Sequence, residues 1–200
     1  MADKVTNILL AGVGGQGILL ASEVLSEVMM LAGYDVKKNE IHGMSQRGGS
    51  VVSHVRFGKK VYSPIIPEGE ADILFGFELL ETCRYLPLLA QHGSVIVNRL
   101  KLMPPAVAIG QQNYPKNLED YIARQVDKSY IVDGLELALQ AGDPRTVNTV
   151  LLGALANMLP VDAQLWIEAL RKMVPQRTLE QNLKAFELGQ ASNAAGQPNQ

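Results

Sequence analysis

The pattern of apolar and polar residues predicts strands alternating with helices over the first two thirds of the chain. A short apolar run at 5–12 is typical of a buried parallel strand and leads into a glycine cluster. Helical spacing follows, and a polar stretch at 34–40 predicts a second strand, so a strand–helix–strand unit opens the chain. The expected buried stripe of the helix is Ile18, Ala21, Leu25, Val28 and Ala32, with Ser22, Glu23, Ser26 and Glu27 on the outer face.

The middle of the chain predicts a hairpin and then further buried strands. Residues 50–58 alternate in polarity, and the lysine-containing turn after them leads to 61–66, so these two segments are expected to pair, with Pro64 marking an end or an edge. Strands are expected at 71–78, 94–99 and 129–134, and helices at 79–91 and 117–126.

Beyond Leu135 the pattern is helical only. Asp143 is a good N-cap with Pro144 at the first helical position, and Trp166 is expected in the core or at an interface. The small polar residues 191–200 predict a disordered tail. The expected fold class is α/β: one Rossmann-like domain over residues 1–190, with a mainly parallel sheet, an inserted β-hairpin and a C-terminal helical group.

The composition argues against nucleic-acid binding, membrane insertion and metal clusters held by several cysteines. The net charge of −2 gives no electrostatic reason to expect a nucleic-acid partner. No apolar run reaches the roughly 18 residues that a membrane helix needs, so no membrane association is expected. The one cysteine, Cys83, excludes an internal disulfide and any cluster held by several thiolates of this chain. A reducing, cytoplasmic location is the expectation.

The first glycine cluster, "GVGGQG", satisfies G-x-G-x-x-G between a strand and a helix. Gly12 permits a tight turn, Gly14 lets a phosphate approach the backbone, and Gly17 lets helix and strand pack closely. Gly15 adds backbone freedom and Gln16 a side-chain donor. The motif predicts an anion site at a helix N-terminus, although a tight turn without a ligand remains an alternative. An NAD site would also need an acidic residue at the end of the second strand, for which Glu40 is a better candidate than Asp35.

The second cluster, "IHGMSQRGGS", follows the second strand. Its glycines, Gly43, Gly48 and Gly49, permit unusual backbone angles and expose N–H groups. Arg47 suits a carboxylate or a phosphate. Neutral hydrogen-bonding groups come from Ser45 and Gln46, and His42 could titrate near neutrality. In a doubly wound sheet both clusters would face one crevice, whereas the alternative is a glycine corner with Arg47 in solvent.

Recognisable catalytic machinery is missing from the sequence. No nucleophile–base arrangement stands out, the three histidines lack metal-ligand spacing, and neither a P-loop lysine nor a thiamine-diphosphate magnesium motif is present. Cys83 falls in an expected helix and is interpreted as a small buried residue. The chain is therefore expected to bind an anion for chemistry performed elsewhere, with no metal of its own.

Three stretches, residues 12–36, 40–58 and 62–78, closely resemble the gamma-type domain of 2-oxoacid:ferredoxin oxidoreductases (the pyruvate/ketoisovalerate family). Within that family the chain is most similar to the beta subunits of indolepyruvate ferredoxin oxidoreductases, over roughly residues 5–188. The most specific part of the resemblance is the "HGMSQRGGS" loop.

The resemblance implies an enzyme that converts a 2-oxo acid and coenzyme A to acyl-CoA and carbon dioxide, with electrons passed to ferredoxin. It implies that thiamine diphosphate, Mg and 4Fe-4S clusters reside in a larger alpha subunit, and that this chain holds no cofactor firmly, with coenzyme A as a possible ligand. Gly12, Gly14, Gly15, Gln16 and Gly17 would form the anion-binding turn. His42, Ser45, Gln46, Arg47, Gly48 and Gly49 would face the partner's active site, with His42 and Arg47 as catalytic candidates.

Two alternatives remain open at this point. One is a free-standing NAD(P)-dependent oxidoreductase built on the first glycine cluster. The other is a non-enzymatic binding or assembly module, with a homodimer formed through the hairpin or the C-terminal helices.

Overall fold

A six-stranded sheet forms the centre of the protein. The computed structural model describes residues 4–43 and 48–192, and the strand order is β2-β3-β1-β4-β5-β6. β1 pairs in parallel with β4, β4 with β5 and β5 with β6, whereas β3 runs antiparallel to both β1 and β2. The strands are β1 (Thr6–Val13), β2 (Asp35–His42), β3 (Ser50–Gly58), β4 (Ala71–Gly76), β5 (Leu89–Asn98) and β6 (Ser129–Val132). The expected α/β class and mainly parallel sheet are confirmed.

The hairpin expected between residues 50–58 and 61–66 was wrong, because the antiparallel pair is formed by β2 and β3 instead. β3 pairs with β2, with His42 opposite Val51, and no strand forms at 61–66. Side chains of β2 and β3 satisfy the backbone of that segment instead. Arg56 donates to the carbonyls of Ser63 and Ile65, and the His54 imidazole accepts from Ile66 N–H. These bonds, together with the missing N–H of Pro64, favour a fixed loop over a ladder.

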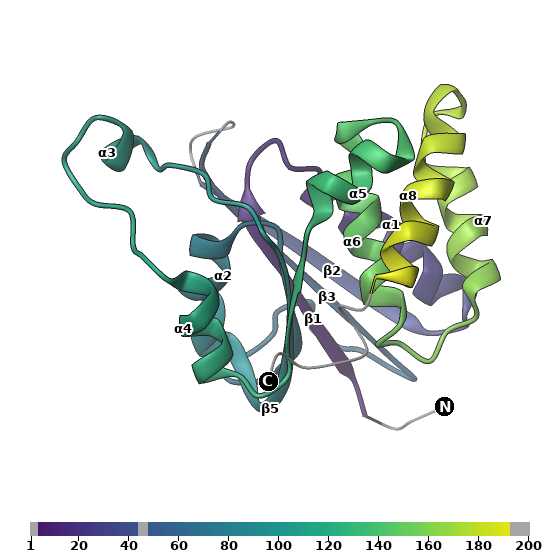
Figure 1. Ribbon diagram of the computed structural model, residues 1–200. Coiled ribbons are helices and arrows are strands. Elements are labelled where there is room, and N and C mark those ends of the chain that lie inside the picture. The colour runs from purple at the N-terminus through teal and green to yellow at the C-terminus, as the bar shows by residue number, and fades with distance from the viewer. Residues whose placement is uncertain (1–3, 44–47, 193–200) are drawn as a thin grey trace.

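One face of the sheet is covered by α1 and the C-terminal helices (Figure 1). They are α1 (Ile18–Leu31), α5 (Gly134–Ala141), α6 (Val147–Ala156), α7 (Ala163–Met173) and α8 (Leu179–Ala191), with short 3₁₀ turns η2 (Pro144–Thr146) and η3 (Gln176–Thr178). The helical end of the chain is confirmed up to Ala191, and residues 193–200 of the expected tail lie outside the described residues. Asp143 does act as a cap, accepting from Arg145 N–H at the start of η2.

The expected outer face of α1 was partly wrong, because Ser22 and Ser26 are buried. The helix packs on the sheet on one side and on α6 and α7 on the other, so little of its surface faces solvent. Both hydroxyls remain satisfied by donating to carbonyls one turn back, at Leu19 and Ser22. Burial of the two serine hydroxyls therefore costs little free energy.

The opposite face of the sheet carries α2 (Leu79–Tyr85) and α4 (Leu118–Gln125). The helix expected at 79–91 was too long: it ends at Tyr85, continues as the 3₁₀ turn η1 (Leu86–Leu88), and β5 begins at Leu89. Pro87 has no N–H for an α-helical bond, which explains the early end. Between β5 and α4 the chain makes a long excursion that contains the short helix α3 (Pro105–Ala108) and projects from the body (Figure 1).

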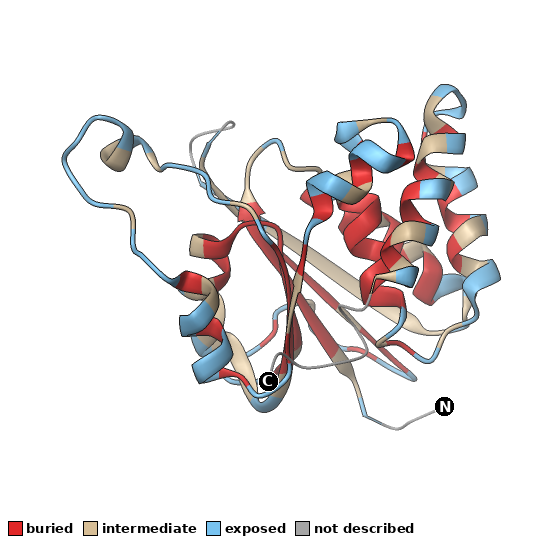
Figure 2. Ribbon diagram, viewed as in Figure 1, coloured by how far each residue is buried: buried red, intermediate tan, exposed pale blue. Residues whose placement is uncertain are grey.

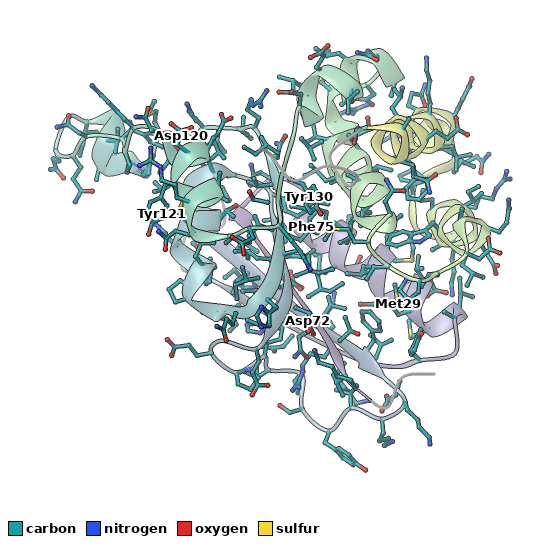
Figure 3. All side chains as sticks on the ribbon, turned by 60° about the horizontal axis from the view of Figure 1, so that its bottom comes forward. Met29, Asp72, Phe75, Asp120, Tyr121 and Tyr130 are labelled. Carbon is teal, nitrogen blue, oxygen red and sulfur yellow. The ribbon has the colours of Figure 1, made fainter. Side chains whose placement is uncertain are left out.

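Two hydrophobic cores lie on the two faces of the sheet, and β1 contributes to both. Ile8 and Leu10 belong to the core under α1 and α5–α8, whereas Leu9 and Ala11 belong to the core under α2 and α4. Buried residues follow the central strands and the inward helix faces in Figure 2. In Figure 3, Phe75 lies in the sheet, with Met29 among the helices on one side and Tyr121 on α4 on the other.

Trp166 is fully buried and stacks on Phe186 of α8, with ring centroids 5.6 Å apart, which confirms its expected core position. Within residues 4–43 and 48–192, no helix combines the length and the apolar character needed to cross a lipid bilayer.

Candidate functional site

The glycine turn between β1 and α1 lies at the carboxyl edge of the sheet, where its backbone needs glycine. Gly17 has φ +76° and Gly15 φ +104°, values that disfavour residues with a side chain. A Cβ on Gly12 would lie 2.6 Å from Gln16 Oε1 and 2.7 Å from Phe77 Cβ. The turn is thus held too closely against the end of β4 to accept a bulkier residue.

The N-terminus of α1 has the features of an anion site. Gly17 occupies the N-cap position, no described side chain caps the helix, and its first turn contains no acidic residue. The first N–H groups of an α-helix have no partner within the helix, and the helix dipole gives this end a partial positive charge. An anion seated here would meet unneutralised donors.

Gln16 braces the turn from inside. Its Oε1 accepts from Val13 N–H at 2.6 Å, and its Nε2 donates to Phe77 O at 3.1 Å. The side chain therefore ties the end of β1 to the end of β4. This leaves one amide N–H for the ligand contact predicted from the sequence, so most of the hydrogen-bonding capacity of Gln16 is structural.

The two glycine clusters meet directly. Gly14 N–H donates to Gly49 O at 2.9 Å, and the register between β1 and β3 places Gly12 opposite Val51. Gly48 has φ +76°, and a Cβ placed on it would have no atom of the described residues within 4 Å, while His42 is exposed at the end of β2. Three predicted site residues, Ser45, Gln46 and Arg47, lie outside the described residues.

A cavity of about 500 Å³ separates the glycine turn from the end of the β2–β3 hairpin. Glu40 faces it, with its carboxylate 3.9 Å from Lys38 Nζ, which is also 3.8 Å from Glu23. The cavity is lined by Val13, Gly14, Gly15, Gly17, Ile18, Leu19, Glu40, His42 and Val51. Gly14, Gly15 and Gly17 of the first predicted loop and His42 of the second thus border one crevice.

A second cavity, of about 490 Å³, lies on the other side of the same turn, towards α5 and α6. Arg99 and Arg145 line it, and each is held by an aspartate: Arg99 Nη1 lies 2.8 Å from an Asp133 oxygen, and Arg145 Nη2 2.7 Å from an Asp143 oxygen. The Arg145 guanidinium holds the pKa of Asp143 at about 2. The two aspartates therefore fix the orientation of the arginine side chains that line this cavity.

Several of these residues were missed from the sequence. Arg99 is the last residue of a predicted strand and Arg145 follows a predicted cap, so their chain positions were visible signals. Asn148 was not detectable, because it reaches the turn only through packing: its Nδ2 donates to Gly17 O at 3.4 Å. Glu78, buried directly after β4, also gave no signal.

Neither metal ligands nor an activated thiol is evident in this region. Across the described residues, no three histidine, cysteine or carboxylate side chains are grouped so that they could hold a metal ion. Burial, with a smaller contribution from Glu78, raises the pKa of the Cys83 thiol to about 11, so the thiolate is disfavoured near neutrality. The described site offers the backbone donors of the α1 N-terminus, which suit binding of an anion, whereas Arg99 and Arg145 are each already paired with an aspartate.

Comparison with known proteins identifies the family. Residues 7–192 match the model of the pyruvate ferredoxin/flavodoxin oxidoreductase family. The chain is 42% identical over 193 residues to the Indolepyruvate oxidoreductase subunit IorB of Pyrococcus horikoshii, covering 93% of this chain and 95% of that protein.

Solved structures share the fold. The pyruvate oxidoreductase subunit PORC of Thermotoga maritima has a TM-score of 0.71 at 22% identity, covering 93% of this chain and 95% of that one. The 2-oxoglutarate:ferredoxin oxidoreductase of Magnetococcus marinus, with 2-oxoglutarate, coenzyme A and succinyl-CoA bound, has a TM-score of 0.76 at 20% identity. That match covers 99% of this chain but 32% of the other. The sequence resemblance is thus confirmed, and the chain belongs to the pyruvate ferredoxin/flavodoxin oxidoreductase family.

Proposed function

We propose that this chain is the non-thiamine subunit of a 2-oxoacid:ferredoxin oxidoreductase that acts on an aryl pyruvate such as indolepyruvate. The enzyme would convert the 2-oxo acid and coenzyme A to acyl-CoA and carbon dioxide, with two electrons passed to ferredoxin. The substrate class is supported by the 42% identity to an indolepyruvate oxidoreductase subunit over nearly the full length of both chains.

The single observation that carries the role of this chain is the contact between Gly14 N–H and Gly49 O. It joins the two glycine clusters beside the uncapped N-terminus of α1, where an anion is favoured. We infer that the crevice receives a phosphate of coenzyme A or the carboxylate of the 2-oxo acid. Gly15, Gly17 and Gly48 would bring backbone N–H groups close, and Ser45, Gln46 and Arg47 would add side-chain donors. His42 would face the partner's active site.

The partner we propose is a larger subunit that carries thiamine diphosphate, Mg and 4Fe-4S clusters. One cysteine cannot supply the four thiolate ligands of such a cluster, so the donor set of this chain does not fit that group. Ferredoxin would interact with the assembled complex. We further infer that residues 1–190 work as one domain, because both helical layers pack on one sheet, and that the chain works in the cytoplasm and is inactive alone.

The test is reconstitution of this chain with the candidate larger subunit, followed by an assay of CoA-dependent ferredoxin reduction with indolepyruvate. Arg47→Ala should raise the KM for coenzyme A or for the 2-oxo acid by about 10-fold or more, since hydrogen bonds to charged groups are worth roughly 1.5–3 kcal/mol. Arg124→Ala is the matched control, because Arg124 is an exposed arginine on α4, on the other face of the sheet. Unchanged assembly and turnover in Arg47→Ala would show that the proposed role of the loop is wrong.

The second candidate, an NAD(P)-dependent oxidoreductase, is favoured by the glycine motif and by Glu40 in the crevice. However, β3 lies between β1 and β2, whereas in a dinucleotide-binding fold the second strand neighbours the first. Calorimetric titration of the isolated chain distinguishes the two functions. Micromolar binding of NADH or NADPH would support this second candidate, and its absence is expected. A chain that binds neither a nucleotide-like ligand nor the larger subunit would instead be an assembly module, such as a homodimer.

A further inference from the structure

The excursion between β5 and α4, residues 99–117, forms an arm that projects from the body of the protein (Figure 1). Three of its apolar side chains are exposed: Leu102 by 38%, Met103 by 58% and Ile109 by 68%. Most of the arm is coloured as exposed in Figure 2. An apolar element that extends away from the hydrophobic cores gains nothing from the folding of this chain alone.

Both ends of the arm are fastened to one buried carboxylate. Glu78 is 1% exposed, and its Oε1 accepts from Leu102 N–H at 3.1 Å and from the Tyr114 hydroxyl at 2.7 Å. Its Oε2 caps α2 by accepting from Glu81 N–H at 2.8 Å. Hydrogen bonds to a buried carboxylate are strong, so Glu78 fixes the direction in which the arm leaves the sheet.

The arm also has a charge signature. Residues 100–117 include Lys101 and Lys116 and no acidic residue, although the whole chain has a net charge of −2. Both lysines are exposed. An element that is apolar at its centre and basic at its ends is complementary to an apolar groove with an acidic rim.

The arm leaves the sheet beside the candidate site. Leu79 N–H donates to Leu100 O, and Arg99 N–H donates to Val132 O, so the first residues of the arm are bonded to the start of α2 and to the carboxyl end of β6. Arg99 and Leu100 also line the second cavity of the glycine turn. A protein that grips the arm would therefore be continuous with the edge at which the ligand is expected.

We propose that the arm is the docking element through which this chain binds its larger subunit. Met103 and Ile109 enter an apolar groove on that subunit, and Lys101 and Lys116 meet acidic side chains at its rim. The inference rests on the proposed function, because the occupant is the thiamine and iron–sulfur subunit. The fixed exit of the arm reduces the ordering cost of binding, which supports docking over a loop that closes on its own chain.

The test measures the Kd between this chain and the purified larger subunit from the same organism, by biolayer interferometry. Met103→Glu and Ile109→Glu should each weaken binding by at least about 10-fold, as expected for apolar residues central to an interface. Tyr62→Glu is the matched control: Tyr62 is 90% exposed, and its loop joins β3 to β4 at the opposite edge of the sheet. It should leave Kd unchanged.

Two further variants separate docking from simple loss of fold. Tyr114→Phe keeps every exposed contact but loosens the arm, so it should weaken binding by a smaller factor than Ile109→Glu while circular dichroism remains native. Lys101→Glu with Lys116→Glu should slow association and reduce its dependence on salt, because rim charges act mainly on the association rate.

The outcomes are distinct. If Met103→Glu and Ile109→Glu bind the larger subunit with the wild-type Kd, the docking role of the arm is wrong and the proposed function remains intact. Failure of the wild-type chain to bind the larger subunit at all overturns both. If analytical ultracentrifugation shows that the arm variants dissolve a homodimer without changing binding to the larger subunit, the arm contacts a second copy and the proposal is wrong.

Discussion

Two glycines of the site have the same backbone φ angle but different surroundings. Comparing their alanine variants distinguishes the cost of backbone strain from the cost of steric crowding. Gly17 and Gly48 both have φ +76°, but among the atoms of residues 4–43 and 48–192 a Cβ would meet a neighbour only at Gly17, at 2.7 Å from Asn148 Nδ2. Gly48→Ala should cost about 1–2 kcal/mol through the left-handed backbone alone. Gly17→Ala should cost about 1 kcal/mol more, since Asn148 must give up its bond to Gly17 O.

Urea unfolding followed by the fluorescence of Trp166 measures both costs. Equal free energies of unfolding for the two variants would contradict the role of Asn148 in holding the turn. Gly17→Ala should also lower the affinity of the chain for the anionic ligand, because the donor-bearing turn is displaced.

Cys83 is a sensitive reporter because it is the only cysteine of the chain. Burial first, and the nearby Glu78 second, raise its pKa from 9.0 to about 11. Alkylation of the native protein should therefore continue to accelerate up to about pH 11, whereas in urea the rate should level off near pH 9. Because the folded pKa is the higher one, the contribution of this thiol to stability is complete below pH 9 and is lost as the pH rises through 11. Mass spectrometry after timed iodoacetamide treatment gives both rates, and identical pH profiles would show that Cys83 is solvated.

Residue-level prediction from the sequence succeeded where a residue acts through its own backbone. The positions of Gly12, Gly14 and Gly17 follow from a local motif, and the structure gives Gly17 a positive φ angle. Prediction failed for residues whose partners are distant in sequence. Gln16 bonds to Phe77, and Glu78 bonds to Leu102 and Tyr114, and no local pattern encodes these pairings.

At the scale of elements, the contact between α6 and α8 depends on two glycines. A Cβ on Gly153 would lie 2.1 Å from Phe186 O, and one on Gly189 would lie 2.0 Å from Val150 O. Helix propensity alone predicts that Gly153→Ala stabilises the protein by about 1 kcal/mol. Overpacking against a backbone carbonyl instead costs about 1–3 kcal/mol or more, so we expect net destabilisation.

The measurement is the free energy of unfolding of Gly153→Ala and Gly189→Ala. Glu187→Ala, at an exposed position of α8, is the control that tests helix propensity without crowding and should change stability little. A stabilised Gly153→Ala variant would mean that the two helices can separate at no cost.

Elements were predictable where local periodicity and burial agree. The strand at 71–78 and the helix at 117–126 were recovered within two residues of their observed bounds. The strand expected at 61–66 does not form because Arg56, His54 and Asp35 hydrogen-bond to its backbone groups, so these groups are not available for a sheet ladder. Pairing partners in a sheet are chosen by long-range contacts, and a sequence window contains none of them.

At the scale of the whole molecule, one sheet joins two cores that share no helix. Alternate residues of β1, β4 and β5 face opposite sides, so each strand is buried by both helical layers. Removing either layer would expose the apolar side of three central strands. The two layers are therefore expected to unfold together, as in a two-state transition.

The only tryptophan and the only cysteine make this testable, because they lie on opposite faces of the sheet. Trp166 is buried among α1 and the C-terminal helices, and Cys83 packs against the core under α2 and α4. Urea titration followed by Trp166 fluorescence and by pulsed alkylation of Cys83 at about pH 8, below the thiol pKa in either state, should give the same midpoint. Alkylation of Cys83 at urea concentrations that leave Trp166 native would show that the α2–α4 layer opens separately. Since α2 is capped by Glu78, which also anchors the arm, such opening would release the arm before the rest of the fold is lost.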